Sequence, residues 1–345
     1  MPTFSILPNI ILRHPDTKYI TLSDFYDKYS DIIEYPVGIL AFDITQLNKI
    51  NQDNGTKAGN KVVSTLAQLI QIAIPEPIYL AQDFNAKLLA IVPHSETSEL
   101  KKKAKFIQKE FKDLVFGIGE AHNNSSINMA IDEALESARI QQILNPSSKK
   151  HESLFALLTM MKNLDKSLEN HVQRTQELSI KIAEKMDLSW LEQSQLQLTC
   201  ILHDVGKLFV PQEILQKPGA LTSAEMTQIK QHAQKGADFL LKMPSFESIA
   251  LFVKYHHERF DGKGYPEGIS GRTIPLLSRI VSLVDSYDAM AHDRIYRKAL
   301  SEKEIVDELL ENMGKQFDPH LVSILIAMIE TGELNTRSEN TLCSS

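Results

Sequence analysis

The sequence predicts a chain of two domains, an α/β domain followed by an all-α helical bundle. Its 345 residues are enough for two domains that each bury a core. Strand-like apolar runs alternate with helical stretches up to about residue 145, whereas helical periodicity dominates from about residue 155 onward. The stretch NPSSKKHES (145–153) between them is rich in Pro, Ser and Lys, which is typical of a linker. We therefore expect domains at 1–145 and 156–335, a linker at 146–155 and a flexible tail at 336–345.

The spacing of apolar residues predicts the individual elements. In the first domain, short apolar runs predict strands at 37–44, 78–82, 87–92 and 114–119. Apolar residues at helical spacing predict helices at 58–73, 96–112 and 126–142. In the second domain, a stripe of Leu and Met from Leu154 to Leu168 opens a series of helices, which continues at 191–208, 223–242, 246–258, 275–292, 302–313 and 319–331. The last helix begins with Asp318 and Pro319, a capping residue followed by Pro at the first helical position.

Composition excludes several classes of protein. Apolar residues make up 43%, charged residues 23%, and the net charge is −7, so the chain has no electrostatic drive toward nucleic acid or an anionic membrane. No apolar run approaches the roughly 20 residues of a membrane helix, and the first residues lack the features of a secretory signal. Two cysteines give neither a disulfide framework nor a Cys-rich zinc site. We therefore expect a soluble protein of the cytoplasm.

Histidine and aspartate side chains stand at near-core positions of the second domain. The set that stands out among the eleven histidines and their acidic neighbours is His171, His203, Asp204, His232, His256, His257 and Asp285. Burial of an imidazolium or a carboxylate without a partner costs several kcal/mol, so the presence of these groups among apolar residues needs a reason. Imidazole and carboxylate are ligands for Mn, Fe or Zn, and a mixed set suits a pair of ions that share a bridging carboxylate. Because the residues lie on different predicted helices or at helix ends, a helical bundle can bring them into one cavity.

Four motifs carry a family resemblance. HDVGK (203–207), HHERFDGKGYPEG (256–268), DSYDAM (285–290) and RIYRKAL (294–300) closely resemble the HD-GYP family, a subgroup of the HD-domain metal-dependent phosphohydrolases. The resemblance covers about 160–332. It implies an HD-type bundle that hydrolyses cyclic di-GMP, to pGpG or onward to GMP, through a metal-activated water. It also implies that all seven residues of the set are metal ligands and that Asp204 is the bridging one. His/Asp sites accept Fe, Mn or Zn, and of these we expect iron or manganese.

Further residues match family positions near the substrate. Lys207, about one turn after His203, would hold a phosphate oxygen and assist catalysis together with Asp204, although a solvated surface lysine has the same pattern. Tyr265, Arg294 and Arg297 match positions near the nucleotide phosphates. Asp288, which follows Asp285 by about one turn, is expected to bind substrate or to orient a ligand or a water, and a plain surface role remains its alternative.

Ser167 departs from the fullest form of the family pattern. Members with three metals carry Glu four residues before the first histidine, where a helix places it on the same face as that ligand. A serine hydroxyl is a poor anionic ligand, so we expect two divalent ions rather than three. The resemblance links the extra ion to cleavage beyond pGpG, which leaves pGpG or GMP open as the end product.

The first domain resembles GGDEF domains, the diguanylate cyclases, in FDITQLNKINQDNGTKAGNKVV (42–63) and AIDEALESAR (130–139). Asp43 and Asn51 keep a metal-binding and a guanine-contacting position. The signature loop aligns with altered residues, namely Phe84, Asn85, Ala86, Lys87 and Leu88. Phe84 is bulky where glycine is needed, and Lys87 places a cation where a metal would sit. We therefore expect no cyclase activity, and a role in dimerisation, regulation or nucleotide binding, or as a scaffold.

The leading hypothesis is a metal-dependent cyclic di-GMP phosphodiesterase fused to a degenerate GGDEF-like domain. The same chemistry on another cyclic dinucleotide, such as cyclic GMP-AMP, is the first alternative, because the motifs specify metals and phosphate better than bases. A non-catalytic cyclic-dinucleotide receptor or interaction protein is the second, and seven intact ligand positions argue against it. Expected partners are the cyclic dinucleotide and either a second copy of the chain or another GGDEF protein, with no nucleic acid and no membrane.

Overall fold

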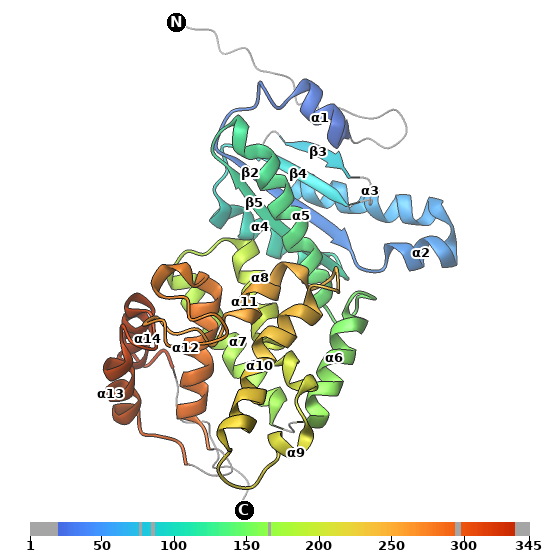
Figure 1. Ribbon diagram of the computed structural model, residues 1–345. Helices are drawn as coiled ribbons and strands as arrows, with labels where there is room; N and C mark the ends of the chain where they lie inside the picture. Colours follow the sequence, from blue (N-terminus) through green and yellow to red (C-terminus); the bar gives the residue numbers. More distant parts are fainter. Residues whose placement is uncertain (1–19, 76–77, 84–86, 165–166, 294–297, 335–345) are drawn as a thin grey trace, which may run out of the picture. The chain divides into compact units, whose positions relative to one another are not determined.

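Figure 1 shows the computed structural model, which describes residues 20–75, 78–83, 87–164, 167–293 and 298–334. The chain divides into two compact units, one formed by Met1–Leu154 with Ser189–Ser194, the other by Phe155–Leu188 with Gln195–Ser345. An α/β region followed by a helical region confirms the predicted fold class. The domain boundaries expected from the sequence stay a prediction. The predicted boundaries put Ser189–Ser194 in the second domain, whereas in the structure this segment belongs to the first unit.

The first unit is built on a five-stranded sheet in the order β1-β3-β4-β2-β5. Its strands are β1 (Ile20–Thr21), β2 (Val37–Ile44), β3 (Tyr79–Gln82), β4 (Leu88–Pro93) and β5 (Leu114–Ala121). β2 pairs antiparallel with β4 and β5, while β1 runs parallel to β3. The four longer strands are the four that the apolar runs predict.

Alternate side chains of β2 enter two hydrophobic layers. The helices of this unit are α1 (Leu22–Lys28), α2 (Leu47–Asn54), α3 (Thr56–Ala73), α4 (Thr97–Glu110) and α5 (Ile127–Leu144). Leu40 and Phe42 pack with α3 and α4, whereas Ile39 and Ala41 pack with α1 and α5. Because both faces of the sheet are covered, β2 is a continuous apolar run instead of an alternating one. The sequence did not predict α2, a short helix that has no buried residue and whose apolar residues are only Leu47 and Ile50.

Trp190 completes the core of the first unit from a distant part of the chain. Its indole stacks on Phe116 of β5 with ring centroids 5.1 Å apart and planes inclined by 12°. The indole Nε1 donates a hydrogen bond to the backbone carbonyl of Phe116 at 3.3 Å, and Lys101 Nζ lies 5.0 Å from the indole centroid. The segment Ser189–Ser194 is thus held to the first unit by an aromatic stack, a hydrogen bond and a cation–π contact.

The second unit is helical. Its helices are α6 (His151–Leu164), α7 (Leu168–Lys185), α8 (Trp190–Leu202), η2 (Val205–Phe209), α9 (Gln212–Leu215), α10 (Ser223–Leu240), η3 (Glu247–Ile249), α11 (Ala250–Lys254), η4 (Gly271–Thr273), α12 (Leu276–Ala291), α13 (Glu302–Asn312) and α14 (Pro319–Glu330). The first residues of α6 and of α8 belong to the first unit. Buried side chains of α7, α8, α12, α13 and α14 form its core. Asp318 caps α14 as predicted, because its carboxylate accepts a hydrogen bond from the backbone N–H of His320 at 2.8 Å. Within the described ranges, no helix combines the length and the apolarity needed to cross a bilayer.

Two predicted helices end earlier than their apolar periodicity indicates. The helix expected at 191–208 stops at Leu202, and a 3₁₀ segment, η2, follows after His203 and Asp204. The helix expected at 246–258 is replaced by η3 and the short α11, which ends at Lys254. In both places the helix ends just before a pair of predicted metal ligands. The apolar pattern alone does not predict these ends, since tertiary context can override local preference.

Candidate metal centre

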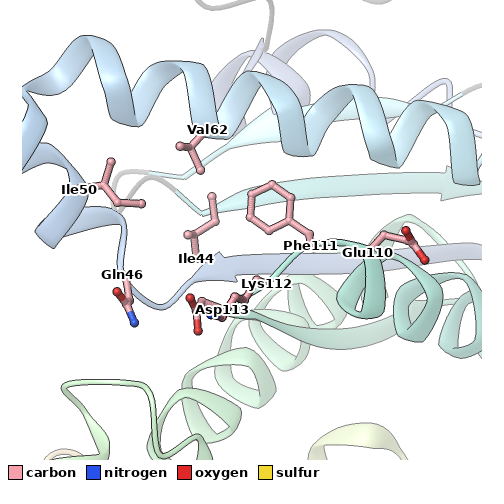
Figure 2. Close-up of a pocket in the computed structure, with 8 residues that line it drawn as sticks. All are labelled: Ile44, Gln46, Ile50, Val62, Glu110, Phe111, Lys112 and Asp113. Carbon is pink, nitrogen blue, oxygen red and sulfur yellow. The ribbon is translucent and has the colours of Figure 1, made fainter.

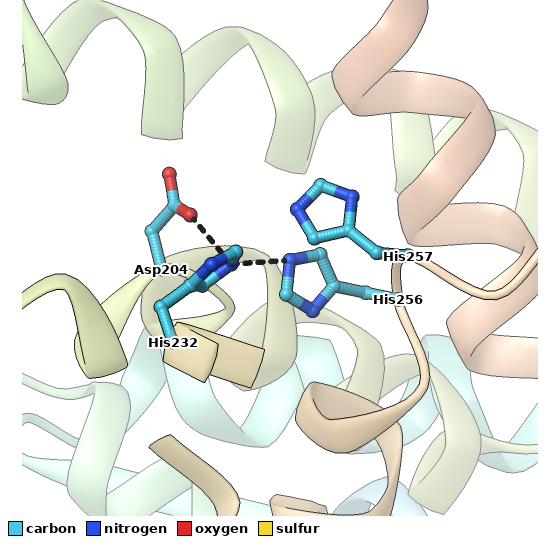
Figure 3. A group of neighbouring side chains, drawn as sticks. All are labelled: Asp204, His232, His256 and His257. Carbon is cyan, nitrogen blue, oxygen red and sulfur yellow. Dashed lines mark hydrogen bonds and ion pairs between the residues drawn. The ribbon is translucent and has the colours of Figure 1, made fainter. Parts of the chain in front are cut away.

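The structure brings the seven predicted ligands together in two groups within the second unit. One group contains Asp204, His232, His256 and His257, and the other contains His171, His203 and Asp285. In each group, one ligand atom from every residue lies within 4.8 Å of the others. Figure 3 shows the first group, in which Asp204 and the three imidazoles point toward one another. The residues come from α7, α10, α12 and the chain segments that follow α8 and α11.

Three imidazoles are oriented by the backbone of their own helical turns. In each, Nδ1 faces the carbonyl oxygen three residues earlier, at 2.8 Å for His203 and Cys200, 2.8 Å for His232 and Ile229, and 2.6 Å for His256 and Val253. A carbonyl oxygen can only accept, so Nδ1 must carry the proton in each of these bonds. Each ring in its neutral form therefore presents an unprotonated Nε2, the form in which histidine binds a metal.

The unprotonated Nε2 atoms have the contacts expected of metal ligands. Nε2 of His203 is buried and has no hydrogen-bond partner in the described chain. Nε2 of His232 and Nε2 of His256 lie 3.3 Å apart, where two lone pairs would face each other without a proton between them. Burial lowers the pKa of His232 and His256, and it lowers the pKa of His257 to about 3. These neutral nitrogen donors fit a divalent cation, which would satisfy the lone pairs that the protein leaves unmatched.

Asp204 lies between the two groups. Its Oδ1 is 3.5 Å from His232 Nε2, and its Oδ2 is 3.5 Å from His203 Nε2. Lys207 Nζ lies 2.6 Å from the same Oδ2. Burial alone would raise the pKa of Asp204, but the charge of Lys207 leads the effects that outweigh burial and hold the pKa well below its usual value. The carboxylate is therefore ionised and offers one oxygen to each group, as a bridging ligand requires.

His171 is held by a carboxylate that is itself clamped by an arginine. Its Nδ1 lies 2.8 Å from Asp288 Oδ2, and its Nε2 lies 3.6 Å from Asp285 Oδ1. Arg174 contacts Asp288 through Nε at 2.5 Å and Nη2 at 2.9 Å. Burial would raise the pKa of Asp288, but the bonds from Arg174 and His171 lower it to about 2. These contacts favour the expectation that Asp288 orients a ligand over the expectation that it binds substrate.

Arg174 was missed by the sequence reasoning. The available signal was its position three residues after His171, which places both side chains on one face of α7. We expect Arg174→Ala to weaken metal binding by about 10–100-fold, the usual cost of losing a partner that orients a ligand. Competitive titration against a chelator measures this. The matched control is Gln173→Ala, an exposed neighbour that bonds only to Glu177 among described residues and should bind metal like the wild type. Equal affinities of the two variants would contradict the role of Arg174.

Tyr265 lies beside the first group. Its ring stacks on His257, with centroids 4.8 Å apart and planes inclined by 29°. The loop that carries it is tied to the cluster, because the backbone N–H of Tyr265 donates to the carbonyl of His257 at 3.2 Å. The buried Glu258 accepts hydrogen bonds from the backbone N–H groups of Glu267 at 2.7 Å and Gly268 at 2.9 Å. A buried carboxylate thus fixes the return of this loop next to the predicted ligands.

The other predicted substrate residues are placed only in part. Lys207 lies at the cluster through its contact with Asp204, and Tyr265 lies there through His257. Arg294 and Arg297 lie outside the described residues. Their expected contact with the nucleotide phosphates stays a prediction.

The first unit places positive charge next to Asp43. Lys150 Nζ lies 4.0 Å from Asp43 Oδ2. Burial raises the pKa of Asp43, and the charges of Lys150 and Lys87 oppose that rise. Lys87 is only 9% exposed, and burial lowers its pKa against the pull of Asp43 and Asp83. Two lysines therefore act electrostatically on the carboxylate where a cyclase would hold a metal, which supports the expectation that this unit is not a cyclase.

The remaining cyclase positions have mixed outcomes. Asn51 Oδ1 is buried without a hydrogen-bond partner in the described chain. Leu88 is a buried residue of β4 that pairs with Phe42. Phe84, Asn85 and Ala86 lie outside the described residues.

The first unit also contains a pocket. Figure 2 shows its lining, with Ile44 of β2, Val62 of α3 and Phe111 grouped around it. The rest of the lining is Gln46, Ile50, Glu110, Lys112 and Asp113. None of the degenerate cyclase positions is among these eight residues, although Ile44 and Ile50 are sequence neighbours of Asp43 and Asn51.

The chain matches two protein families. Residues 156–321 match the family described as HD domain, and residues 28–145 match the family described as diguanylate cyclase, GGDEF domain. The first match contains all seven His and Asp residues of the two ligand groups. The second contains four of the five strands of the sheet, β2 to β5.

Three relatives illustrate the similarity over longer stretches. A protein named cyclic di-GMP phosphodiesterase from Thermotoga maritima is 29% identical over 83% of this chain and 84% of its own length. The cyclic di-GMP phosphodiesterase response regulator RpfG from Xanthomonas campestris is 32% identical over 56% of this chain and 52% of its own. The 3'3'-cGAMP-specific phosphodiesterase 2 from Vibrio cholerae is 25% identical over 78% of this chain and 54% of its own. The chain thus spans most of the first relative and about half of the other two.

Proposed function

Because residues 156–321 match the HD domain family and residues 28–145 match the GGDEF domain family, we infer that this chain is a metal-dependent phosphodiesterase that hydrolyses cyclic di-GMP. The observation that carries the proposal is the arrangement of seven donors in two groups around the shared carboxylate of Asp204. The names of the Thermotoga and Xanthomonas relatives support cyclic di-GMP as the substrate.

His171, His203, Asp204, His232, His256, His257 and Asp285 would hold the ions. Divalent ions in such a site acidify a water molecule and offset negative charge on the phosphate oxygens. Lys207 would hold a non-bridging phosphate oxygen, since its ammonium group already lies at the cluster. Arg174 and Asp288 keep the ring of His171 in place, so the ligand set is organised before substrate arrives.

We propose two ions, iron or manganese, with pGpG as the main product. The proposal on ion number rests on Ser167, which lies at the N-terminal cap of α7 with its carbonyl 3.2 Å from the backbone nitrogen of His171. Ser167, four positions before His171, therefore has no carboxylate to offer to a third ion. Iron and manganese both accept imidazole and carboxylate ligands, so the donor set fits either.

Cyclic GMP-AMP is the second candidate substrate. The observation that favours it is the similarity to the cGAMP-specific relative from Vibrio cholerae. The seven residues of the cluster would bind metal and phosphate, not the bases, so both substrates suit the same cluster. For the first unit we propose a regulatory or dimerisation role without cyclase activity, in a homodimer or with another GGDEF protein.

Turnover tests the proposal. Protein purified with and without oxygen and loaded with iron or manganese is expected to convert cyclic di-GMP to pGpG, and a chelator is expected to stop the reaction. Liquid chromatography of the products, with cyclic GMP-AMP assayed in parallel, measures substrate choice, and elemental analysis measures the ions bound per chain. Protein that binds cyclic di-GMP without cleaving it would contradict the enzyme and favour a receptor. Three ions per chain would contradict the inference from Ser167.

A further inference from the structure

Lys230 of α10 places a positive charge next to the candidate metal centre. Its Nζ lies 5.2 Å from the centroid of the Tyr265 ring, within the range of a cation–π contact. The same ring stacks on His257, a member of the first ligand group, and its centroid is 6.4 Å from that of His232. Lys230 therefore borders the cluster through one aromatic side chain.

The charge of Lys230 differs from the other charges at this site. Lys207 is paired with Asp204, and Arg174 is paired with Asp288. In the part of the chain that the structure describes, no carboxylate forms an ion pair with Lys230, whose side chain is exposed. An aromatic face attracts a cation without neutralising it, so the ammonium group keeps its charge and its three donors for an anion.

The proposed substrate carries two phosphodiester groups, and only one of them can react at the His/Asp cluster at a time. We propose that Lys230 binds the second phosphate of the cyclic dinucleotide, the one that is not being cleaved. The inference rests on the proposed function and assigns this chain a residue that selects diesters with two phosphates. Tyr265 serves as the platform that holds the ammonium group beside the cluster.

Two substrates separate this role from a general effect on the site. Cyclic di-GMP has two phosphodiesters, whereas bis(p-nitrophenyl) phosphate has one. Lys230→Ala is expected to lower kcat/KM for cyclic di-GMP by about tenfold, the size of one hydrogen bond to a charged group, mainly through KM. Its kcat/KM for bis(p-nitrophenyl) phosphate should equal that of the wild type. Lys230→Arg keeps the charge and should restore most of the loss.

Lys235→Ala is the matched control, because Lys235 lies on the same helix and its Nζ faces the carbonyl of Phe209 at 3.5 Å, away from any described aromatic contact. It should behave like the wild type on both substrates. Equal losses on both substrates in Lys230→Ala, or no loss on either, would overturn the assignment. Calorimetry on the metal-loaded variants measures the Kd for cyclic di-GMP, and so tests the role of Lys230 independently of turnover. Wild-type protein that cleaves neither substrate contradicts the proposed function, and an unchanged Kd in Lys230→Ala contradicts the role of Lys230.

Discussion

Asp204→Asn is expected to lower kcat for cyclic di-GMP by about 10³-fold or more, at the upper end of what one electrostatic element contributes to an active site. The two carboxylate oxygens face different histidines, His232 and His203, each at 3.5 Å. An amide has nearly the same shape, but it carries no charge and presents an N–H donor on one side. It therefore cannot serve both groups of ligands, and Lys207 loses its ionic partner.

Product chromatography and metal analysis together measure this outcome. The variant is expected to hold fewer than two ions per chain, and circular dichroism should report the helix content of the wild type. Asp238→Asn makes the same chemical change on the exposed face of α10, where Asp238 accepts a hydrogen bond from Gln234. Its activity should stay within about twofold of the wild type, as for most surface substitutions. An Asp204→Asn protein with full metal content and full turnover would refute the bridging role.

Gly206→Ala is expected to destabilise the second unit by about 3 kcal/mol and to weaken metal binding, because η2 and α10 touch at this glycine. A Cβ atom on Gly206 would lie 1.8 Å from the carbonyl oxygen of His232 and 2.7 Å from the backbone nitrogen of Gly236. Backbone atoms cannot yield as a flexible side chain does, so η2 must move away from α10. That movement separates Asp204, which precedes η2, from His232 on α10.

Thermal unfolding and metal titration measure both effects, and the melting temperature should fall by about 6–12 °C for a unit of this size. Gly236→Ala is the graded control on the opposite side of the same contact. Its Cβ would approach Gly206 N to 3.1 Å and Gly206 Cα to 3.3 Å, which requires a shift of only a few tenths of an ångström. In that helix, alanine also gains about 1 kcal/mol of helix propensity over glycine. If the two variants melt together, the close approach at Gly206 does not limit stability.

The grouping of the seven His and Asp residues could be predicted from the sequence because they stand out chemically. An apolar segment such as CILHDVGKLFV leaves few reasons for a histidine and an aspartate at its centre, and the structure places both in the cluster. The strands were predicted for a similar reason, since a strand covered on both faces, such as β2, has a continuous apolar run, here from Val37 to Phe42. Both predictions depend on the identity of residues within one short segment.

The rest depends on contacts between segments far apart in the sequence. Arg174 has the appearance of an ordinary helical arginine until Asp288, 114 positions away, is placed beside it. Lys230 likewise gains its neighbour only when the loop of Tyr265 folds back onto α10. The close approach of η2 to α10, just after α8 ends at Leu202, is also a contact between distant segments.

The stack of Trp190 on Phe116 bears on how this gene can be divided for expression. The first unit consists of two stretches of chain, and the second of them, Ser189–Ser194, follows α7. A fragment that stops at Leu154 lacks the indole that covers Phe116, whose side chain is only 2% exposed in the intact chain. Its freshly uncovered aromatic surface would favour aggregation. A fragment that starts at Phe155 contains Trp190 without Phe116, so the indole is left exposed. No division of the gene at one position therefore yields both units intact.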